Sequence, residues 1–195
     1  MKLLLASQNK HKIVEISHIF NGYEIELIDL SFFNDQDEVV ENGKTFLENA
    51  IIKAKYYAHK YQMITISDDS GLAVDALGGK PGIYSKRYSG GLDIDNNQKL
   101  LDEMKLIKNR KAQFTSVIVI YFPDGHIFHY EGSIEGLIAY EPKGSNGFGY
   151  DPIFYLPNYD KHMAELDMEI KNKISHRAQA LKQVKEHLDE IINYK

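Results

Sequence analysis

The sequence of 195 residues contains no cysteine, which excludes disulfide bonds, thiolate nucleophiles and cysteine-based zinc or iron-sulfur sites. It also lacks any apolar run near the roughly 18 residues needed to cross a bilayer. The first residues show no apolar segment followed by a cleavage site, as a signal peptide would. We therefore expect a soluble, cytoplasmic protein that makes no membrane contact.

Basic residues are outnumbered, with 23 Lys and Arg against 28 Asp and Glu and a formal net charge of -5. Proteins that bind duplex nucleic acid regardless of sequence need many Lys and Arg contacts to phosphate, so we expect no stable nucleic-acid complex. An acidic excess is most often a solvated surface, although it also suits carboxylates gathered around a divalent cation. The length and the 43% hydrophobic content favour a single domain, residues 1–195, with two lobes.

Strand and helix patterns alternate along the chain. The strand patterns cover residues 2–6, 23–30, 63–66, 113–122 and 127–138, and the last two form a hairpin around Pro123, Asp124 and Gly125. Helix patterns follow residue 9 up to Asn21 and Gly22, run from Thr45 to about Tyr61, begin near Asp93, and cover residues 175–193. Thr45, with Glu48 three residues later, has the form of a capping box at the start of the second of these helices. This alternation with a late hairpin predicts an α/β fold around a mixed sheet.

Asp68 and Asp69 follow directly after the apolar strand pattern 63–66. Side chains at the end of a strand project from a rigid element into a loop-lined cleft. Adjacent carboxylates repel, so solvent, basic neighbours or a metal must compensate for their proximity. Taken alone, the pair is better explained as an ordinary turn, because Asp, Ser and Gly are common there.

A second polar segment lies where the first strand gives way to the first helix, and comprises Ser7, Gln8, Asn9, Lys10, His11 and Lys12. Free backbone N–H groups and ammonium groups at such a junction can face an anion. The segment lacks the glycines of a Walker A loop, so the general P-loop interpretation fails. A simple helix cap formed by Ser7 or Asn9 explains the segment equally well.

Three further features are suggestive, and each has an unremarkable explanation. Asn49 and Lys53 share one face of the helix after Thr45, where a solvated face is the default interpretation. Gly147 to Asp151 places aromatic rings between glycines, so that one ring can stack on a nucleobase. His176 and Arg177 begin the last helix and can donate hydrogen bonds to a carbonyl or phosphate oxygen.

Five segments taken in order closely resemble the inosine/xanthosine triphosphate pyrophosphatases, a HAM1-like family that acts on non-standard purine nucleotides. They are ASQNKHK (6–12), ENGKTFLENAIIKA (41–54), SDDSGLAVDALGGKPGIYSKRYSG (67–90), GFGYDPIF (147–154) and KISHRAQAL (173–181). The third and fourth segments distinguish this family from the related Maf-type nucleotide pyrophosphatases. The chain departs from the pattern at His11, often a glycine, and at Val40, often a second glutamate beside Glu41.

The resemblance implies an elongated two-lobed α/β fold around a long mixed sheet flanked by helices, with the active-site cleft between the lobes. It further implies a homodimer that uses Mg²⁺ to hydrolyse ITP, dITP and XTP between the α- and β-phosphates. The products would be a nucleoside monophosphate and pyrophosphate, which cleanses the nucleotide pool.

The resemblance also implies roles for individual residues. Glu41 and Asp69 would bind the metal, and Asp69 would also activate the attacking water, with Asp68 assisting or sharing both roles of Asp69. Lys12 and Lys53 would hold the phosphates. The remaining expected substrate contacts are Ser7, Gln8, Asn9, Lys10, His11, Ser70, Phe148, Gly149, Tyr150, Asp151, Lys171, His176 and Arg177.

Specificity would come from the base edge, because inosine and xanthine present a 6-oxo acceptor where adenine presents a 6-amino donor. Donors that remain unpaired against adenine can discriminate by roughly 10⁴ or more at a buried site. Two other classes stay open: a catalytically silent purine-nucleotide sensor, and a phosphotransferase that delivers the group to an acceptor other than water.

Overall fold

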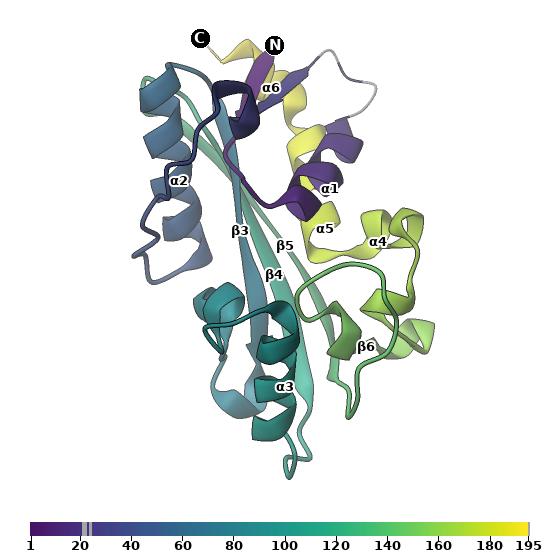
Figure 1. Ribbon diagram of the computed structural model, residues 1–195. Coiled ribbons are helices and arrows are strands. Elements are labelled where there is room, and N and C mark those ends of the chain that lie inside the picture. Colours follow the sequence, from purple (N-terminus) through teal and green to yellow (C-terminus); the bar gives the residue numbers. More distant parts are fainter. Residues whose placement is uncertain (21–22, 24, 195) are drawn as a thin grey trace. The chain divides into compact units, whose positions relative to one another are not determined.

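The computed structural model describes the chain except residues 21, 22, 24 and 195, and describes residue 19 by its backbone only. Seven strands form one mixed sheet in the order β2-β1-β3-β4-β5-β6-β7 (Figure 1). The strands are β1 (Lys2–Leu5), β2 (Glu26–Asp29), β3 (Thr65–Val74), β4 (Lys111–Tyr121), β5 (Ile127–Ile138), β6 (Phe154–Leu156) and β7 (Lys161–His162). The first pairings, β1 with β2 and with β3, are parallel, whereas β5 with β6 and β6 with β7 are antiparallel. The predicted α/β class with a mixed sheet is therefore confirmed.

The chain divides into two compact units that are interleaved in sequence. Unit 1 comprises Met1–Asp69, Ser116–Gly132 and Arg177–Lys195, and unit 2 comprises Ser70–Thr115 and Ser133–His176. The assignment of residues 1–195 to a single domain stays a prediction.

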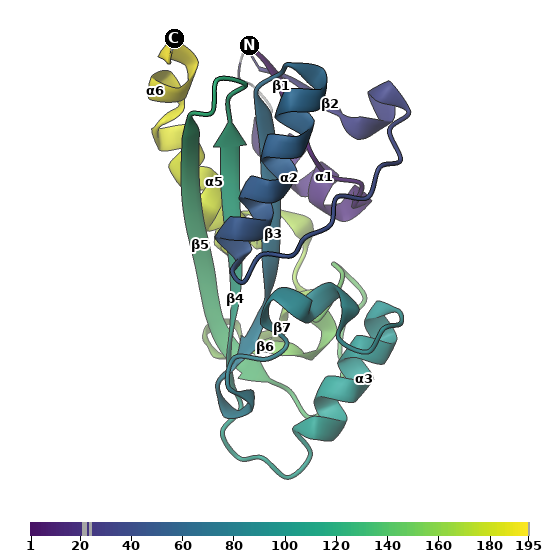
Figure 2. The same ribbon diagram turned by 90° about the vertical axis from the view of Figure 1, so that its left-hand side faces the viewer.

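In unit 1, helices cover both faces of the sheet (Figures 1 and 2). On one face, α2 (Phe46–Tyr61) packs Ala50, Ala54 and Ala58 against alternate residues of β4. On the other, α1 (Lys10–Phe20), α5 (His176–Glu186) and α6 (Leu188–Asn193) cover the remaining residues of β1, β3 and β4. This arrangement follows from strand geometry, because successive side chains point to opposite faces.

Helix α2 begins at the predicted cap. The Thr45 hydroxyl accepts a hydrogen bond from the Glu48 N–H at 3.1 Å, which satisfies one of the free donors of the first turn. The Glu48 carboxylate accepts from the N–H of Lys44 at 2.5 Å, one residue before the cap itself. The capping box is thus confirmed in its first half and shifted by one residue in its second.

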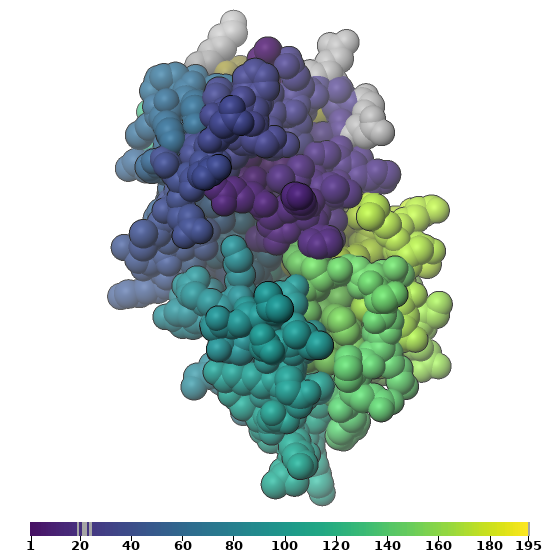
Figure 3. All heavy atoms as spheres, in the orientation of Figure 1, coloured from purple at the N-terminus to yellow at the C-terminus, as the bar shows by residue number. Residues whose placement is uncertain are grey.

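Unit 2 has its own apolar core, in which Leu100 and Met104 at the end of α3 (Asp93–Glu103) pack with Leu72, Val74 and Phe154. The surface of α3 adjoins the surface of the loop of residues 143–150, which precedes the 3-10 turn Asp151–Ile153 (Figure 3). Among the described residues, no helix combines the length and the apolar character needed to cross a membrane.

The structure corrects several predicted boundaries. Strand β3 continues to Val74, so Asp68 and Asp69 lie inside a strand and are not in a turn after it. The predicted helix 175–193 is two helices, α5 and α6, separated at His187. Strand β2 is shorter than residues 23–30, and the predicted stop at Asn21 and Gly22 falls outside the described residues. The sequence interpretation did not include α4 (Met168–Ile174), β6 or β7.

Candidate active site

The register of the parallel strands brings the polar segment after β1 to Asp68. Leu5 pairs with Ile66, so the chain leaves β1 two residues before the level of Asp68 on β3. The Lys12 ammonium group then reaches back from the first turn of α1 to the Asp68 carboxylate, with Nζ 2.5 Å from Oδ2. Residues far apart in sequence are thus joined at the carboxyl end of β1, beside the interior of β3. The carboxyl ends of strands are where α/β proteins commonly place their ligands.

Asp68 is fixed on the side of the sheet covered by α1 and α5. Its carboxylate also accepts hydrogen bonds from the Ser116 hydroxyl and from Arg177, whose Nη2 lies 3.2 Å from Oδ2. Burial opposes ionisation most strongly, but Arg177, Lys12 and Ser116 together outweigh it and lower the pKa of Asp68. These partners therefore favour the ionised form of Asp68, and its two carboxylate oxygens are already bonded to protein groups.

Arg177 is 1% exposed and connects Asp68 to a second buried acid. Its guanidinium donates to the Glu15 carboxylate through Nη1 and to Asp68 through Nε and Nη2. A buried guanidinium needs such partners, because an unpaired charge in an apolar interior is strongly destabilising. The expected contact between Arg177 and the base stays a prediction, and the contacts seen here are with carboxylates of the protein.

Asp69 points to the other face of β3, the side covered by α2. Ser67, two residues earlier on the same face, donates from its hydroxyl to the Ala50 carbonyl of α2 at 2.7 Å. Asp69 is 8% exposed, and its Oδ2 has no hydrogen-bond partner among the described residues. Burial, opposed by Lys53 and Lys12 and reinforced by Glu41 and Asp68, raises the pKa of Asp69 to about 6. The two adjacent acids are thus in opposite electrostatic situations.

The loop around Glu41 is held against α2 by two side chains of that helix. The Lys53 ammonium lies 2.5 Å from Glu41 Oε1, and Asn49, fully buried four residues earlier, accepts from the Gly43 N–H at 2.8 Å. The default interpretation of this face as solvated is therefore wrong. Lys53, Lys12 and Glu41 all act on the charge of Asp69. We call these four residues together with Asp68 the acidic cluster.

Within the segment Ser7 to Lys12, local hydrogen bonds match the helix-cap alternative. The Asn9 side chain accepts from the N–H groups of His11 and Lys12, at 3.0 and 3.3 Å, and the Ser7 hydroxyl accepts from the Asn9 N–H. Several N–H groups that could face an anion are thus already bonded. Of the six residues, Lys12 is the one that the structure brings into the acidic cluster.

Unit 2 brings together three of the residues expected at the base, Phe148, Asp151 and Lys171. The Oδ2 atom of Asp151 accepts hydrogen bonds from the Lys171 ammonium at 2.7 Å and from the Phe148 N–H at 2.9 Å. The Lys171 ammonium also lies 4.9 Å from the centre of the Phe148 ring. Gly147 has a φ of +80°, and a Cβ there would collide with the Asp151 carboxylate, so glycine is required on both counts.

The other residues expected in unit 2 occupy distinct positions. His176 stacks on Phe114, with ring centres 4.8 Å apart, and is 6% exposed. The Tyr150 hydroxyl donates to the Ser85 carbonyl at 2.9 Å, and the Tyr150 ring belongs to the core of unit 2. Ser70 lies in β3 and is partly exposed. Their expected contacts with substrate stay predictions.

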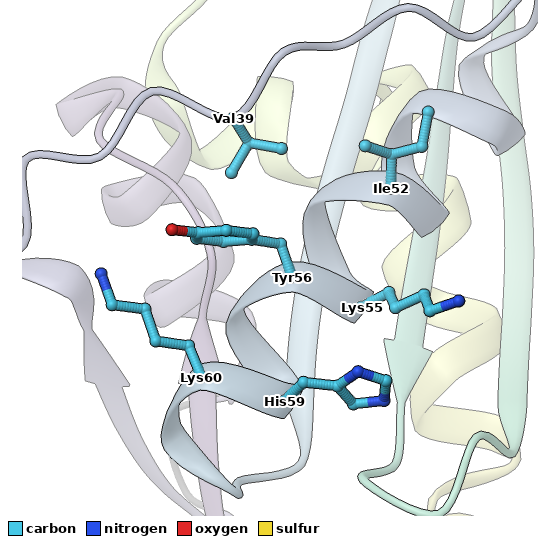
Figure 4. Close-up of a pocket in the computed structure, with 6 residues that line it drawn as sticks. All are labelled: Val39, Ile52, Lys55, Tyr56, His59 and Lys60. Atoms are coloured by element: carbon cyan, nitrogen blue, oxygen red, sulfur yellow. The ribbon is translucent and has the colours of Figure 1, made fainter.

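A separate hollow of about 670 Å³ lies over the outer surface of α2 and is lined by Val39, Ile52, Lys55, Tyr56, His59 and Lys60 (Figure 4). None of the acids and lysines of the cluster described above lines it. Lys60 binds Asp35 and Asp37 at 2.7 and 2.6 Å, and so its charge is locally compensated. This hollow is not the candidate active site.

Sequence reasoning missed two residues of the buried network around Asp68, one that pairs with Arg177 and one that bonds Asp68 directly. Glu15 is one, and its position three residues after Lys12 on a helix was the available signal, because residues so spaced share a face. Ser116 is the other, and it stands among apolar strand residues with no pattern of its own. Among the described residues, no three His, Asp or Glu side chains form a ready-made metal site.

Comparisons with known proteins identify the family of this chain. The model of the Ham1 family matches residues 3–187. A dITP/XTP pyrophosphatase of Acholeplasma laidlawii is 45% identical over 194 residues, with 100% of this chain and 96% of the relative covered. A dITP/XTP pyrophosphatase of Desulforamulus reducens is 46% identical over 195 residues, with 98% of this chain and 97% of the relative covered.

Solved structures give the same result. A HAM1 protein from Coxiella burnetii superposes with a TM-score of 0.90 at 40% identity, covering 97% of this chain and 99% of that one. The Ham1 protein of Staphylococcus aureus superposes with a TM-score of 0.89 at 41% identity, covering 98% and 100%. The chain therefore belongs to the Ham1 family.

Proposed function

We propose that this protein hydrolyses the non-standard purine nucleotides dITP, XTP and ITP to the nucleoside monophosphate and pyrophosphate. The observation that carries the proposal is the buried Asp69 carboxylate, which has an unpartnered oxygen and lies among the charges of Lys12, Lys53 and Glu41. The ammonium groups suit the phosphate oxygens of a nucleoside triphosphate, and the carboxylates suit the cation that accompanies them. The dITP/XTP pyrophosphatases of Acholeplasma laidlawii and Desulforamulus reducens support dITP and XTP as substrates.

The two adjacent acids take different roles in this proposal. Asp69 would hold the metal and would accept the proton of the attacking water, because its Oδ2 has no hydrogen-bond partner among the described residues and its pKa is raised toward neutrality. Asp68 holds Lys12 in place, since its own oxygens are bonded to Lys12, Ser116 and Arg177. Lys12 and Lys53 bind the phosphates, which offer them a second set of anionic oxygens.

The residues present fit a magnesium ion. Mg²⁺ is usually held by one or two carboxylates together with waters and substrate phosphates, and Asp69 with Glu41 supplies that number. The free Oδ2 of Asp69 is a buried acceptor that a cation would satisfy. When bound, the ion neutralises phosphate charge and lowers the pKa of water.

The cluster in unit 2 supports purine recognition. Phe148 offers a ring for stacking, and the Lys171 ammonium and nearby N–H groups are donors suited to a 6-oxo purine. Adenine, with a 6-amino group, would leave such donors unpaired. His176 and Arg177 remain proposed contacts of the base, and Ser70 remains a proposed contact of the phosphates. The homodimer, the elongated two-lobed shape and the cleft remain expectations from the family resemblance.

The test incubates the purified protein and Mg²⁺ with ITP, dITP, XTP, GTP and ATP, and measures monophosphate and pyrophosphate separately. We expect rapid turnover of the first three. Equal turnover of ATP would reject the base selectivity, and orthophosphate as the first product would reject the bond assignment. Asp69→Asn should abolish turnover, whereas Asp102→Asn, the same change at an exposed position of α3, should leave it unaltered.

The same assay distinguishes the alternative classes. A silent nucleotide sensor would bind ITP without releasing pyrophosphate, and a phosphotransferase would transfer the group to an added acceptor in preference to water. Release of pyrophosphate from dITP in buffer without an added acceptor would exclude both the sensor and the phosphotransferase.

A further inference from the structure

Two side chains of helix α3 form hydrogen bonds with the two backbone polar groups of Gly149, the residue after Phe148. The Gly149 N–H donates to Asp93 Oδ2 at 2.7 Å, and the Gly149 carbonyl accepts from Asn97 Nδ2 at 3.0 Å. Asp93 and Asn97 are four residues apart, so they lie one turn from each other on the same face of α3. In the space-filling view, the surface of α3 meets the surface of the loop that contains Gly149, residues 143–150, in agreement with these bonds (Figure 3).

These bonds complete a set that fixes the backbone of Phe148. The Phe148 N–H is held by Asp151 at 2.9 Å, and the next N–H along the chain, that of Gly149, is held by Asp93. The two soft torsions of Phe148 lie between these nitrogens, so holding both fixes the direction in which the ring leaves the backbone. Gly149 itself has a φ of +62°, a conformation that few residues other than glycine adopt readily.

We propose that Asp93 and Asn97 are positioning residues for purine recognition, acting through the Gly149 peptide to hold the Phe148 ring in its stacking orientation. The inference rests on the proposed function, because it assigns a role to the ring only if the ring meets a base. Among the described residues, the hydrogen bonds of both side chains go to the backbone of Gly149. Their contribution is pre-organisation, since a loop held before binding loses less conformational freedom when the base arrives.

The position of Asp93 suits this task. It is the first residue of α3, where the helix dipole favours a carboxylate, and its acceptor is directed to a neighbouring loop. The start of the helix is capped by another acid, Asp95, which accepts from the Leu92 N–H at 2.9 Å. Asp93 can therefore be changed while the cap from Asp95 remains.

The test compares variants of these acids by steady-state kinetics with dITP and by calorimetric binding of inosine monophosphate and of pyrophosphate. Asp93→Ala should raise the KM for dITP and the Kd for inosine monophosphate about 3- to 10-fold, the effect of one hydrogen bond. Its kcat and its affinity for pyrophosphate should stay within about twofold of the parent, because the bond acts on the base alone. Asp93→Asn keeps an acceptor oxygen and should restore most of the loss. Asn97→Ala should change the same two constants in the same direction.

Three controls determine what each result means. Phe148→Ala should weaken inosine monophosphate about 5- to 150-fold, the range found for base stacking on an aromatic ring. Asp95→Ala, which removes the cap of the same helix end, and Asp102→Asn, which changes a remote acid of α3, should leave both constants unaltered.

An unchanged Asp93→Ala variant beside a weakened Phe148→Ala variant would overturn this inference and leave the proposed function standing. If Phe148→Ala also bound inosine monophosphate normally, the stacking role in the proposed function would fail, and the inference with it. An equal loss of affinity for pyrophosphate, or the same loss in Asp95→Ala, would show a general effect on folding and would likewise overturn it.

Discussion

Replacing Asp69 by Asn should stabilise the metal-free protein while it abolishes catalysis. Burial raises the pKa of Asp69 from 3.8 in an ordinary chain to about 6. A shift of about 2 pH units corresponds to about 3 kcal/mol, at 1.36 kcal/mol for each unit. Above pH 6 the folded protein carries this cost in full, because the unfolded chain ionises the same carboxyl group more easily.

The pH dependence gives the sign of the effect. Between about pH 4 and pH 6 the folded state binds a proton that the unfolded chain has released, so stability falls as the pH rises through this window. Asn cannot ionise, and the variant therefore escapes the loss. At pH 8 in chelator, Asp69→Asn should unfold in urea with a free energy up to about 3 kcal/mol above that of the parent, and near pH 4 the difference should largely vanish.

The neighbouring acid provides the control, because its situation is reversed. Since Arg177, Lys12 and Ser116 lower the pKa of Asp68, Asp68→Asn should destabilise the protein at pH 8. Added Mg²⁺ should raise the melting temperature of the parent and should do so far less in Asp69→Asn. The reasoning is refuted if Asp69→Asn is no more stable than the parent at pH 8 in chelator, or if both substitutions shift stability in the same direction.

Three other substitutions test the packing of the site. Arg177→Met should lower the free energy of unfolding by about 3–5 kcal/mol, because it leaves the Asp68 and Glu15 carboxylates with an uncompensated buried charge; a loss below 1 kcal/mol in urea unfolding would contradict this. Thr45→Ala should cost about 1 kcal/mol through loss of the α2 cap, and Thr45→Ser should restore it in the same measurement. Gly147→Ala should lower the melting temperature more than Gly78→Ala, because both glycines have positive φ but only at Gly147 does a Cβ meet a side chain; equal losses would show that backbone strain alone is responsible.

Sequence patterns predicted the fold class well because burial on the two faces of a strand and on one side of a helix leaves a regular signal. The apolar stripe of α2 and its Thr45 cap are examples, since both depend on neighbours within a few residues. The course of β3 could not be predicted in this way. Asp68 and Asp69 have low strand propensity, and they are accommodated in a strand through partners such as Arg177, 109 residues away.

The candidate site shows the same division. The acids and lysines of the cluster were found through family resemblance, and their local patterns alone favoured turns, caps and solvated faces. Glu15 and Asp93 act on residues that are near in space and distant in sequence, and no local pattern assigned them to the site. The helix break at His187 also went unpredicted, because Leu188 and Ile191 continue an apolar pattern that gives no sign of a stop.

The placement of Asp68 and Asp69 in one continuous strand limits how β3 can change. A single residue inserted or deleted between Thr65 and Asp68 would exchange the environments of the two carboxylates, so that the free acid would meet Arg177 and the anchored one would meet α2. Such a change alters neither composition nor charge appreciably, yet it would abolish the role of Asp68 in holding Lys12 and the role proposed for Asp69 in catalysis. Length variation should therefore be confined to loops such as that between α3 and β4, and engineered insertions should avoid β3.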